Sequence, residues 1–269
     1  MPTPIEILLD PISLSIIFMF AALMIWEALF LARNLAVVKG LKLRGLVAFI
    51  IFFFLSSYLP LFWDSYLVEY QLINMSHINV IPATLIGLLV YEFGVYIWHR
   101  LIHKSDFLWK TFHQMHHSAE NVDTYGAFYF SPLDMIGWTF LGSLSLTLIV
   151  GLDPQAVTNI VLLTTFFAIF QHANIRTPVW LGYFVQRPES HNIHHAKNIH
   201  AFNYSDLPLF DVLFGTFNNP RIFQGENGFY NGASAKVGDM LLCKNISHDS
   251  NKYHKTSNDI LSPNLGKNS

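Results

Sequence analysis

The sequence predicts an all-α, multi-pass membrane protein with about four to five membrane helices and a cytoplasmic helical cap that contains histidine boxes. Three observations predict this class. Charged residues make up only 13% of the 269 residues, whereas soluble domains have about 25%. Hydrophobic residues make up 52%, and the mean hydropathy is +0.36. Several apolar windows also reach the ~20 residues that a helix needs to cross the hydrocarbon core of a bilayer.

Five apolar windows qualify as membrane spans, and they cover residues 12–32, 45–63, 79–98, 133–150 and 155–171. Only "GLDP" separates the last two, which predicts a tight hairpin of two helices that need not cross the bilayer completely. No Lys or Arg precedes the first window, so we expect a retained span and not a cleaved signal peptide. The single cysteine, Cys243, excludes an internal disulfide framework and fits a reducing compartment.

Basic residues follow the first, third and fifth windows, and the loop after the second window has none. Because segments rich in Lys and Arg stay on the cytoplasmic side of a membrane, this alternation predicts an external N-terminus and cytoplasmic histidine clusters. The basic residues are Arg33, Lys39, Lys42 and Arg44, then Arg100, Lys104 and Lys110, and finally Arg176, Arg187 and Lys197.

The chain changes composition near residue 225. We predict that residues 1–224 form a single integral membrane domain. Residues 225–269 are rich in Gly, Asn, Ser and Lys, which predicts a polar C-terminal surface extension that is partly disordered. The formal net charge of −2 gives no argument for a nucleic-acid partner.

Histidine is concentrated in three boxes, "HRLIH", "HQMHH" and "HNIHH". Residues three and four apart on a helix share a face, so we expect each box to point its imidazoles in one direction. Imidazole binds Fe, Zn, Cu and Ni, and packing so many imidazoles without a metal would leave buried polar groups unpaired. The predicted metal ligands are His99, His103, His113, His116, His117, His191, His194 and His195.

Eight imidazoles exceed the four to six ligands of one metal ion, so the sequence predicts two ions. His172, in "FQHANIR" at the end of the fifth window, is a ninth predicted ligand. Asn174 is a candidate for a weak or water-mediated ligand, and His200 for a supporting or surface position. The remaining histidines are expected to be ordinary surface or boundary residues: His77, His248 and His254.

Metal-bound imidazoles need acceptors for their second ring nitrogen. Glu92 lies about two helical turns before His99 on the same predicted helix, and an acid inside a span indicates function. Glu27, in the first window, has no obvious partner. The other acids near the boxes are Asp123, Asp134, Glu189, Asp206 and Asp211.

The three boxes and their flanks resemble the membrane fatty acid hydroxylase/sterol desaturase superfamily. The flanks are "YEFGVYIWHRLIH", "SPLDMI" and "NYSDLPLFDVLFGTFNNP", and the resemblance runs from about Tyr91 to Pro220 and includes the "HAN" at His172. Many sterol-modifying members have an "HP" pair where this chain has "SP" after Phe130, which weakens a specific claim for sterol chemistry.

The resemblance implies a cytoplasm-facing centre of two iron ions that uses O2 and external electrons to hydroxylate or desaturate a lipid, such as a fatty acyl, sterol or isoprenoid chain. Zinc is expected to replace iron in overproduced protein, because imidazole sites accept both. The chain has no G-x-G-x-x-G and no P-loop, so we expect electrons from a separate carrier, such as a ferredoxin or a cytochrome b5-like protein.

Other classes of protein also use histidine. The main alternative is a metal transporter or metal-binding membrane protein with cytoplasmic histidine clusters, although transporters place ligands near the bilayer midplane. A haem protein needs single histidines on facing helices. A zinc protease of the H-E-x-x-H type is excluded because that motif is absent. Metal content and O2-dependent turnover discriminate among these classes.

Overall fold

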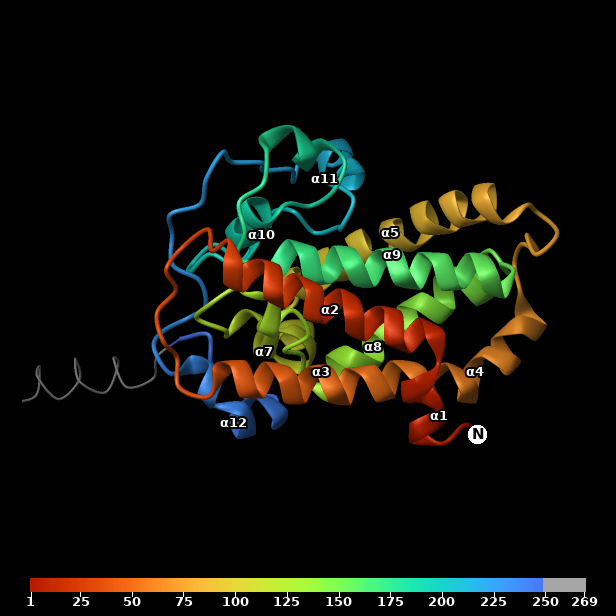
Figure 1. The fold of residues 1–269 in the computed structure, drawn as a ribbon, viewed down its shortest axis with the longest axis horizontal. Helices are drawn as coiled ribbons and strands as arrows, with labels where there is room; N and C mark the ends of the chain where they lie inside the picture. Colours follow the sequence, from red (N-terminus) through yellow and green to blue (C-terminus); the bar gives the residue numbers. More distant parts are fainter. Residues whose placement is uncertain (249–269) are drawn as a thin grey trace, which may run out of the picture.

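A computed structural model describes residues 1–248, which are helical without any strand (Figure 1). Two isolated β-bridges, Leu31 with Ile175 and Ala196 with Asn227, are the extended pairings among these residues. The prediction of an all-α protein is therefore confirmed.

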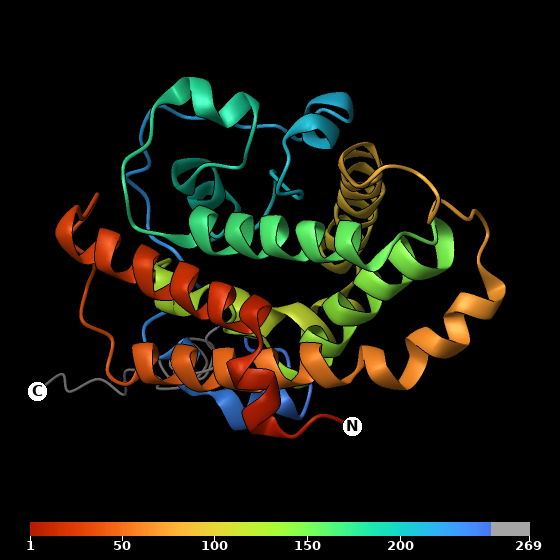
Figure 2. The same ribbon diagram turned by 45° about the vertical axis from the view of Figure 1, so that its right-hand side comes forward.

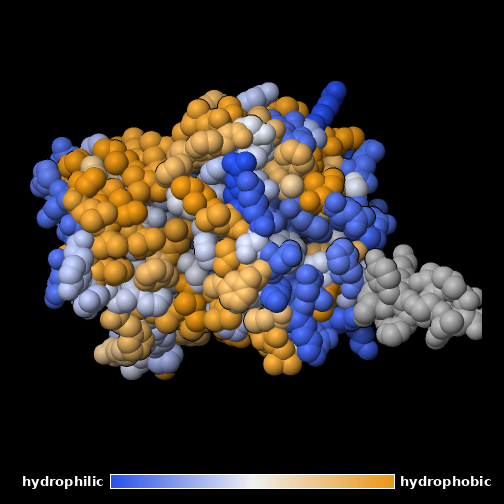
Figure 3. Space-filling model, turned by 180° about the vertical axis from the view of Figure 1, so that it is seen from behind, coloured by the Kyte–Doolittle hydropathy of each residue, from blue (hydrophilic) through white to orange (hydrophobic). Residues whose placement is uncertain are grey.

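Five helical segments are long and apolar enough to cross a membrane, which confirms the predicted four to five spans. Figures 1 and 2 show α4 continuing α3 with a bend, and Figure 3 shows a broad apolar band with hydrophilic residues on both sides of it. The segments are α2 (Pro11–Leu29), α3 (Leu41–Tyr58) with α4 (Pro60–Leu67) and η1 (Val68–Tyr70), α5 (Val80–Lys104), α8 (Pro132–Ser143) with η4 (Leu144–Ile149), and α9 (Pro154–His172).

Three of these spans begin at the same local signal. Asp10, Ser131 and Asp153 each accept a hydrogen bond from a backbone N–H in the first turn of α2, α8 and α9, and a proline follows each of them. Proline fits the first helical position because the N–H that it lacks would have no partner there. α5 runs past the predicted end at residue 98 to Lys104, so the whole first box lies on this span.

α3 approaches the loop after the second box closely at Gly45. A Cβ atom at this position would lie 2.2 Å from the carbonyl oxygen of Tyr125. Only glycine permits this approach, which brings the start of α3 against η3 (Thr124–Gly126). Short helices complete the fold: α1 (Pro4–Leu9), α6 (Asp106–Leu108), η2 (Trp109–His113), α7 (Gln114–His117), η5 (Val179–Tyr183), α10 (Pro188–His194), α11 (Leu209–Leu213), η6 (Ala233–Ala235) and α12 (Val237–Leu241).

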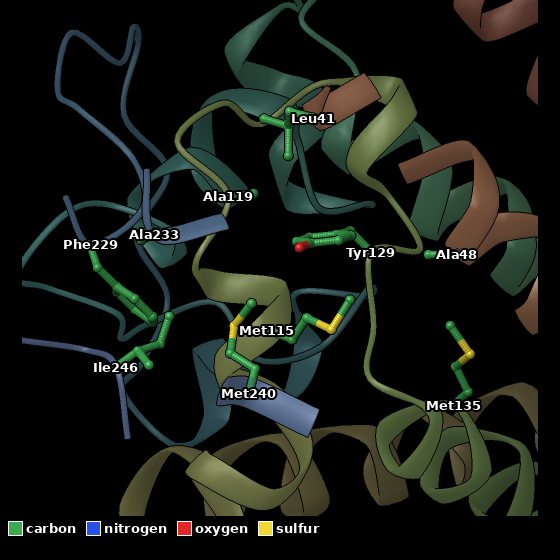
Figure 4. Packing of buried hydrophobic residues seen from close by; sticks show 10 residues of the cluster. All are labelled: Leu41, Ala48, Met115, Ala119, Tyr129, Met135, Phe229, Ala233, Met240 and Ile246. Atoms are coloured by element: carbon green, nitrogen blue, oxygen red, sulfur yellow. The ribbon is translucent and has the colours of Figure 1, made fainter. Parts of the chain in front are cut away.

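The segment after residue 225 differs from the expected surface extension. Phe229, Met240 and Ile246 are buried and pack in one cluster with Met115 of the second box (Figure 4). Apolar residues spaced among the Gly and Asn residues of this segment form that contact. Residues 249–269, with His254, lie outside the described residues, and the domain boundary at residue 224 stays a prediction.

Candidate metal centre

Nine histidines come together at the end of the molecule where α5 and α9 terminate, and they are the nine predicted ligands. They form two groups, and within each group one nitrogen of every side chain lies within 4.8 Å of the others. The five-His group contains His99, His103, His113, His117 and His194, and the four-His group contains His116, His172, His191 and His195.

The motif H-x-x-H-H serves both groups at once. His116 belongs to the four-His group and its neighbour His117 to the five-His group, and the adjacent pair His194 and His195 divides in the same way. Adjacent residues on a helix point about 100° apart, since one turn takes 3.6 residues. The expectation that each box points in one direction is therefore wrong for these pairs, and the double histidine is what links the two groups.

Backbone carbonyls fix the rings of three histidines in the five-His group. Each of these histidines donates its Nδ1–H to a carbonyl oxygen, which is an acceptor only, so the proton lies on Nδ1 and Nε2 keeps a free lone pair. The pairs are His99 with Tyr204 at 2.8 Å, His103 with His200 at 2.9 Å and His194 with Phe202 at 2.7 Å.

Side chains support the other two ligands of this group. Nδ1 of His113 lies 2.7 Å from Oδ2 of Asp134, and Nδ1 of His117 lies 3.0 Å from Nδ1 of His200. Nε2 of His113 faces Nε2 of His99 at 3.0 Å. With the protons on Nδ1, two lone pairs meet there, an arrangement that a cation stabilises. Three further Nε2 atoms are buried without a partner, those of His103, His117 and His194.

The Nε2 atoms of the four-His group converge. That of His172 lies 3.1 Å from Nε2 of His116 and 3.0 Å from Nε2 of His191, which in turn lies 3.0 Å from Nε2 of His195. His172 donates its Nδ1–H to the carbonyl of Ala168. The Nδ1 atoms of the other three are buried without a partner in the structure.

The two groups are almost completely shielded from water. Eight of the nine side chains are buried and His103 is half-buried. Neutral imidazole is the form that binds metals, and this donor set suits iron or zinc, so the residues fit a pair of such ions. Burial, together with the neighbouring imidazoles, lowers the pKa well below its usual value at His113, His116, His117, His191, His194 and His195.

Among the acids proposed as supports, only Asp134 forms a hydrogen bond to one of the nine histidines within residues 1–248. Asp211 and Glu92 act one step further away, because their carboxylates accept hydrogen bonds from the backbone N–H groups of residues 204–207. The remaining acids hold other parts of the chain: Asp123 caps η3, Asp206 accepts from Gln171, and Glu189 pairs with Arg187 and Thr177.

Asn174 does not point a free amide at the histidines. Its Oδ1 accepts from the Arg33 backbone N–H, and its Nδ2 donates to the Arg33 carbonyl. Glu27, without a predicted partner, accepts from Thr124 N–H and Oγ1–H and from Asn174 N–H. His200 lies beside the centre and not at the surface, whereas His77 and His248 are exposed as expected.

The sequence reasoning missed the carbonyl groups of residues 200, 202 and 204. Every residue has a carbonyl, so no residue type indicates which carbonyl accepts a hydrogen bond from a histidine. The left-handed φ of 71° at Phe202 also cannot be recognised from the sequence. It also missed Tyr204, whose ring lies 5.4–5.7 Å from those of His99, His103 and His194. The resemblance over "NYSDLPLFD" marked the segment but not its function.

A cavity of about 730 Å³ opens beside the four-His group. Its wall includes Asn192, which follows His191 on α10, and Asn174, which lies two residues after His172. Arg33 forms part of the same wall and donates to Asn192 and to the Gly225 carbonyl. The cavity thus lies next to residues that neighbour the four-His group in the sequence, and no histidine among residues 1–248 lines it.

Comparison with known proteins identifies a matching family model and several related proteins. A family model described as fatty acid hydroxylase matches residues 84–216, which include all nine histidines. The chain is 33% identical over 140 residues to ornithine lipid hydroxylase OlsE of Rhizobium tropici, covering 50% of this chain and 41% of that protein. It is 25% identical over 154 residues to sphinganine C4-monooxygenase 1 of Arabidopsis thaliana, covering 56% and 59%.

A third relative is human alkylglycerol monooxygenase, 28% identical over 141 residues, which cover 50% of this chain and 31% of that protein. The matches thus span between about a third and three fifths of these three relatives. No solved structure matches the chain significantly.

Proposed function

The chain belongs to the fatty acid hydroxylase family, and from that premise we propose that it is a membrane oxidoreductase that uses O2 to hydroxylate or desaturate a lipid at a centre of two iron ions. One observation supports this most strongly: nine buried imidazoles converge in two groups at the end of the membrane spans. Five and four imidazoles are each enough for one ion and together are too many for one.

The protein residues have three tasks in this proposal. The Nε2 atoms bind the ions, and the carbonyl and carboxylate partners on Nδ1 orient the rings. Bound iron with O2 would supply the oxidising power against an unactivated C–H bond, which no side chain has. The buried setting excludes water, and the ring of Phe130, 4.5 Å from that of His116, covers the four-His group on one side.

A lipid substrate is supported by the spans and by the relatives. The names of three relatives refer to an ornithine lipid, sphinganine and alkylglycerol. Since their polar parts differ, we propose the lipid class without choosing among fatty acyl, sterol and isoprenoid chains. In this proposal Arg33 and Asn192, which line the cavity, would contact a lipid headgroup while the hydrocarbon lies among the spans.

We propose that the metal centre faces the cytoplasm. Every Lys and Arg among residues 1–248 lies in the segments at the histidine end of the spans or in the half of a span next to that end, and the loops at the opposite end of the spans have none. This asymmetry follows the positive-inside rule. A cytoplasmic centre can receive electrons from a soluble or membrane-bound carrier such as a ferredoxin or a cytochrome b5-like protein.

Metal analysis and turnover test the proposal together. Protein produced with ample iron should contain two iron ions per chain and should consume O2 with a reductant and a lipid extract, giving an oxygenated or desaturated lipid. Comparing the lipids of a deletion strain with those of the complemented strain would identify the substrate. Bound metal without any O2-dependent change in lipid would contradict the enzyme and favour the metal-transport alternative.

A further inference from the structure

We propose that the two groups bind metal with unequal affinity: the five-His group holds its ion tightly, and the four-His group holds an exchangeable ion. This inference rests on the proposed function and predicts which of its two metal sites has the higher affinity. The observation that carries it is a difference in what supports the rings. Every Nδ1 atom of the five-His group has a partner, whereas three of the four Nδ1 atoms in the four-His group have none.

The support of the five-His group is a carbonyl comb, which we define as the backbone carbonyls of residues 200, 202 and 204. The comb depends on backbone conformations that non-glycine residues rarely adopt. His200, Phe202 and Asn203 have φ values of 42°, 71° and 52°. Such strain persists only where the surrounding structure holds it. Here the strained backbone directs three carbonyl groups at three of the proposed ligands.

Asp211 is the side chain that fixes the comb, and it is a positioning residue. Its fully buried carboxylate accepts from the N–H of Tyr204 at 2.8 Å, from the N–H of Ser205 at 3.0 Å and from Oγ1–H of Thr216 at 2.7 Å. Asn203 adds a second anchor, because its Nδ2 donates to the carbonyls of residues 190 and 218. Protein side chains therefore hold the comb in place through hydrogen bonds.

The four-His group lacks such a frame. Within the described part of the chain its only carbonyl partner is Ala168, one turn before His172 on the same helix. Partners on the second ring nitrogen change metal affinity by about 10–100-fold, and this group also has one ligand fewer. Both differences point to weaker binding in the same group.

Chelator competition on the full-length protein loaded with zinc tests the ranking without any turnover. We expect wild-type protein to release its zinc in two steps of one ion each. His195→Ala should abolish the easily released ion and keep the resistant one, whereas His194→Ala should weaken the resistant step and leave the easily released step where it is. Simultaneous release of both ions, or loss of the resistant ion in His195→Ala, would overturn the proposal.

Asp211→Asn tests the comb itself. The resistant step should move about 10–100-fold toward weaker binding, while the easily released step stays where it is. A merely structural role would weaken both steps alike. Thr216→Val, which removes one bond to the carboxylate, serves if Asp211→Asn does not fold, and should give a smaller shift of the same step. Single-step release with intact O2-dependent turnover would refute this ranking alone, and two-step release without turnover would refute the proposed function alone.

A separate observation concerns an apolar surface on the cap, which we call the cap patch and define as residues 180–184 and 209–214. We infer that the cap patch lies in the surface of the bilayer. Its two segments have no exposed charged side chain, since Asp211 is fully buried. Its exposed side chains are Trp180, Tyr183, Phe184, Leu209, Val212, Leu213 and Phe214, each between 44% and 69% exposed.

The cap patch continues the lipid-facing surface of α5. The ring of Phe214 stacks on Tyr96 at 5.1 Å, and that of Phe210 lies 5.2 Å from Phe93. Phe93 is 42% exposed on the outer face of α5, roughly 20 Å along this helix from Val80. That position is still inside a hydrocarbon core of about 30 Å, and exposed Trp and Tyr are typical of the membrane interface.

Single-cysteine labelling tests this placement, because Cys243 is the only cysteine. In a Cys243→Ser background, a fluorophore on Leu213→Cys in lipid nanodiscs should be quenched by nitroxide-labelled lipid and protected from iodide. The matched control is Leu242→Cys, 71% exposed near α12, which iodide should quench. Iodide quenching of Leu213→Cys without lipid quenching would overturn the inference.

Discussion

The Nε2 atoms of His116 and His172 lie 3.1 Å apart, although 56 residues separate them in the chain. The contact joins the second box to the C-terminal end of α9, where no box motif occurs. It completes a group whose other two members, His191 and His195, come from α10 and its end. The position of α9 therefore decides whether this group contains four imidazoles or three.

We expect His172→Ala to remove one metal ion per chain and to abolish turnover, because three imidazoles without support on Nδ1 hold an ion poorly. Metal analysis and a turnover assay measure this. His248→Ala, an exposed position in the cap, is the control and should change neither. Full metal content in His172→Ala would show that the ninth imidazole is not a ligand.

Asp134 should control the affinity of the five-His group through His113. Asp134→Leu removes the only partner of Nδ1 of His113, 2.7 Å away, and we expect about 10–100-fold weaker metal binding. Asp134→Asn keeps an acceptor oxygen and should recover part of the affinity. Asp153→Asn, at the cap of α9 far from the histidines, is the matched acid control. Equal metal affinity in the leucine and asparagine variants would contradict the orienting role.

Acidification should destabilise the metal-free protein below about pH 6.5. An unfolded histidine takes up a proton near that pH, whereas burial lowers the pKa of His200 to about 4, so the unfolded state binds more protons between these values. The same sign applies to the buried His113, His116, His117, His191, His194 and His195.

Three acids outside the spans oppose this trend. Burial raises the pKa of Asp206 to about 7, that of Asp123 to about 6 with a contribution from Glu27, and that of Asp211 above its usual value, so all three stabilise the fold as the pH falls. The histidines outnumber them, and we expect the melting temperature to decrease from pH 7.5 to pH 5.5. The melting temperature of metal-loaded protein should decrease more over the same pH range, since protons also compete with the metal for the imidazoles. A melting temperature that rises on acidification would contradict this balance.

Motif and hydropathy predicted which histidines lie together but not how they divide between the two groups. Apolar length located the spans, and box spacing located eight of the nine histidines. Which group His116 or His117 joins depends on the orientation of α7 relative to α9 and α10, and tertiary packing determines that orientation. The carbonyl comb and the buried part of residues 225–248 were equally out of reach, because backbone conformation and long-range packing determine them.

Glu27 should contribute to stability and not to metal binding. Its carboxylate accepts three hydrogen bonds that join α2 to residues 124 and 174. Glu27→Leu leaves these buried donors unpaired, and each such loss costs about 1–3 kcal/mol. We expect a clear decrease in the melting temperature of the purified protein, and a smaller one for Glu27→Gln, which keeps one acceptor. An unchanged melting temperature in Glu27→Leu would show that the three bonds do not hold α2 in place.

The orientation in the membrane is open to a paired labelling test. Val37 is fully exposed in the loop between α2 and α3 on the histidine side, and Leu72, 73% exposed, lies in the loop before α5 at the other end. In a Cys243→Ser background, a membrane-impermeant maleimide should label Leu72→Cys in intact cells. It should label Val37→Cys only after the membrane is permeabilised, because the Lys- and Arg-rich side stays in the cytoplasm.

The reverse pattern would place the histidines outside the cell and would remove the cytoplasmic electron supply from the proposed mechanism. Labelling at both positions in intact cells would mean that the segments between them do not cross the membrane an odd number of times.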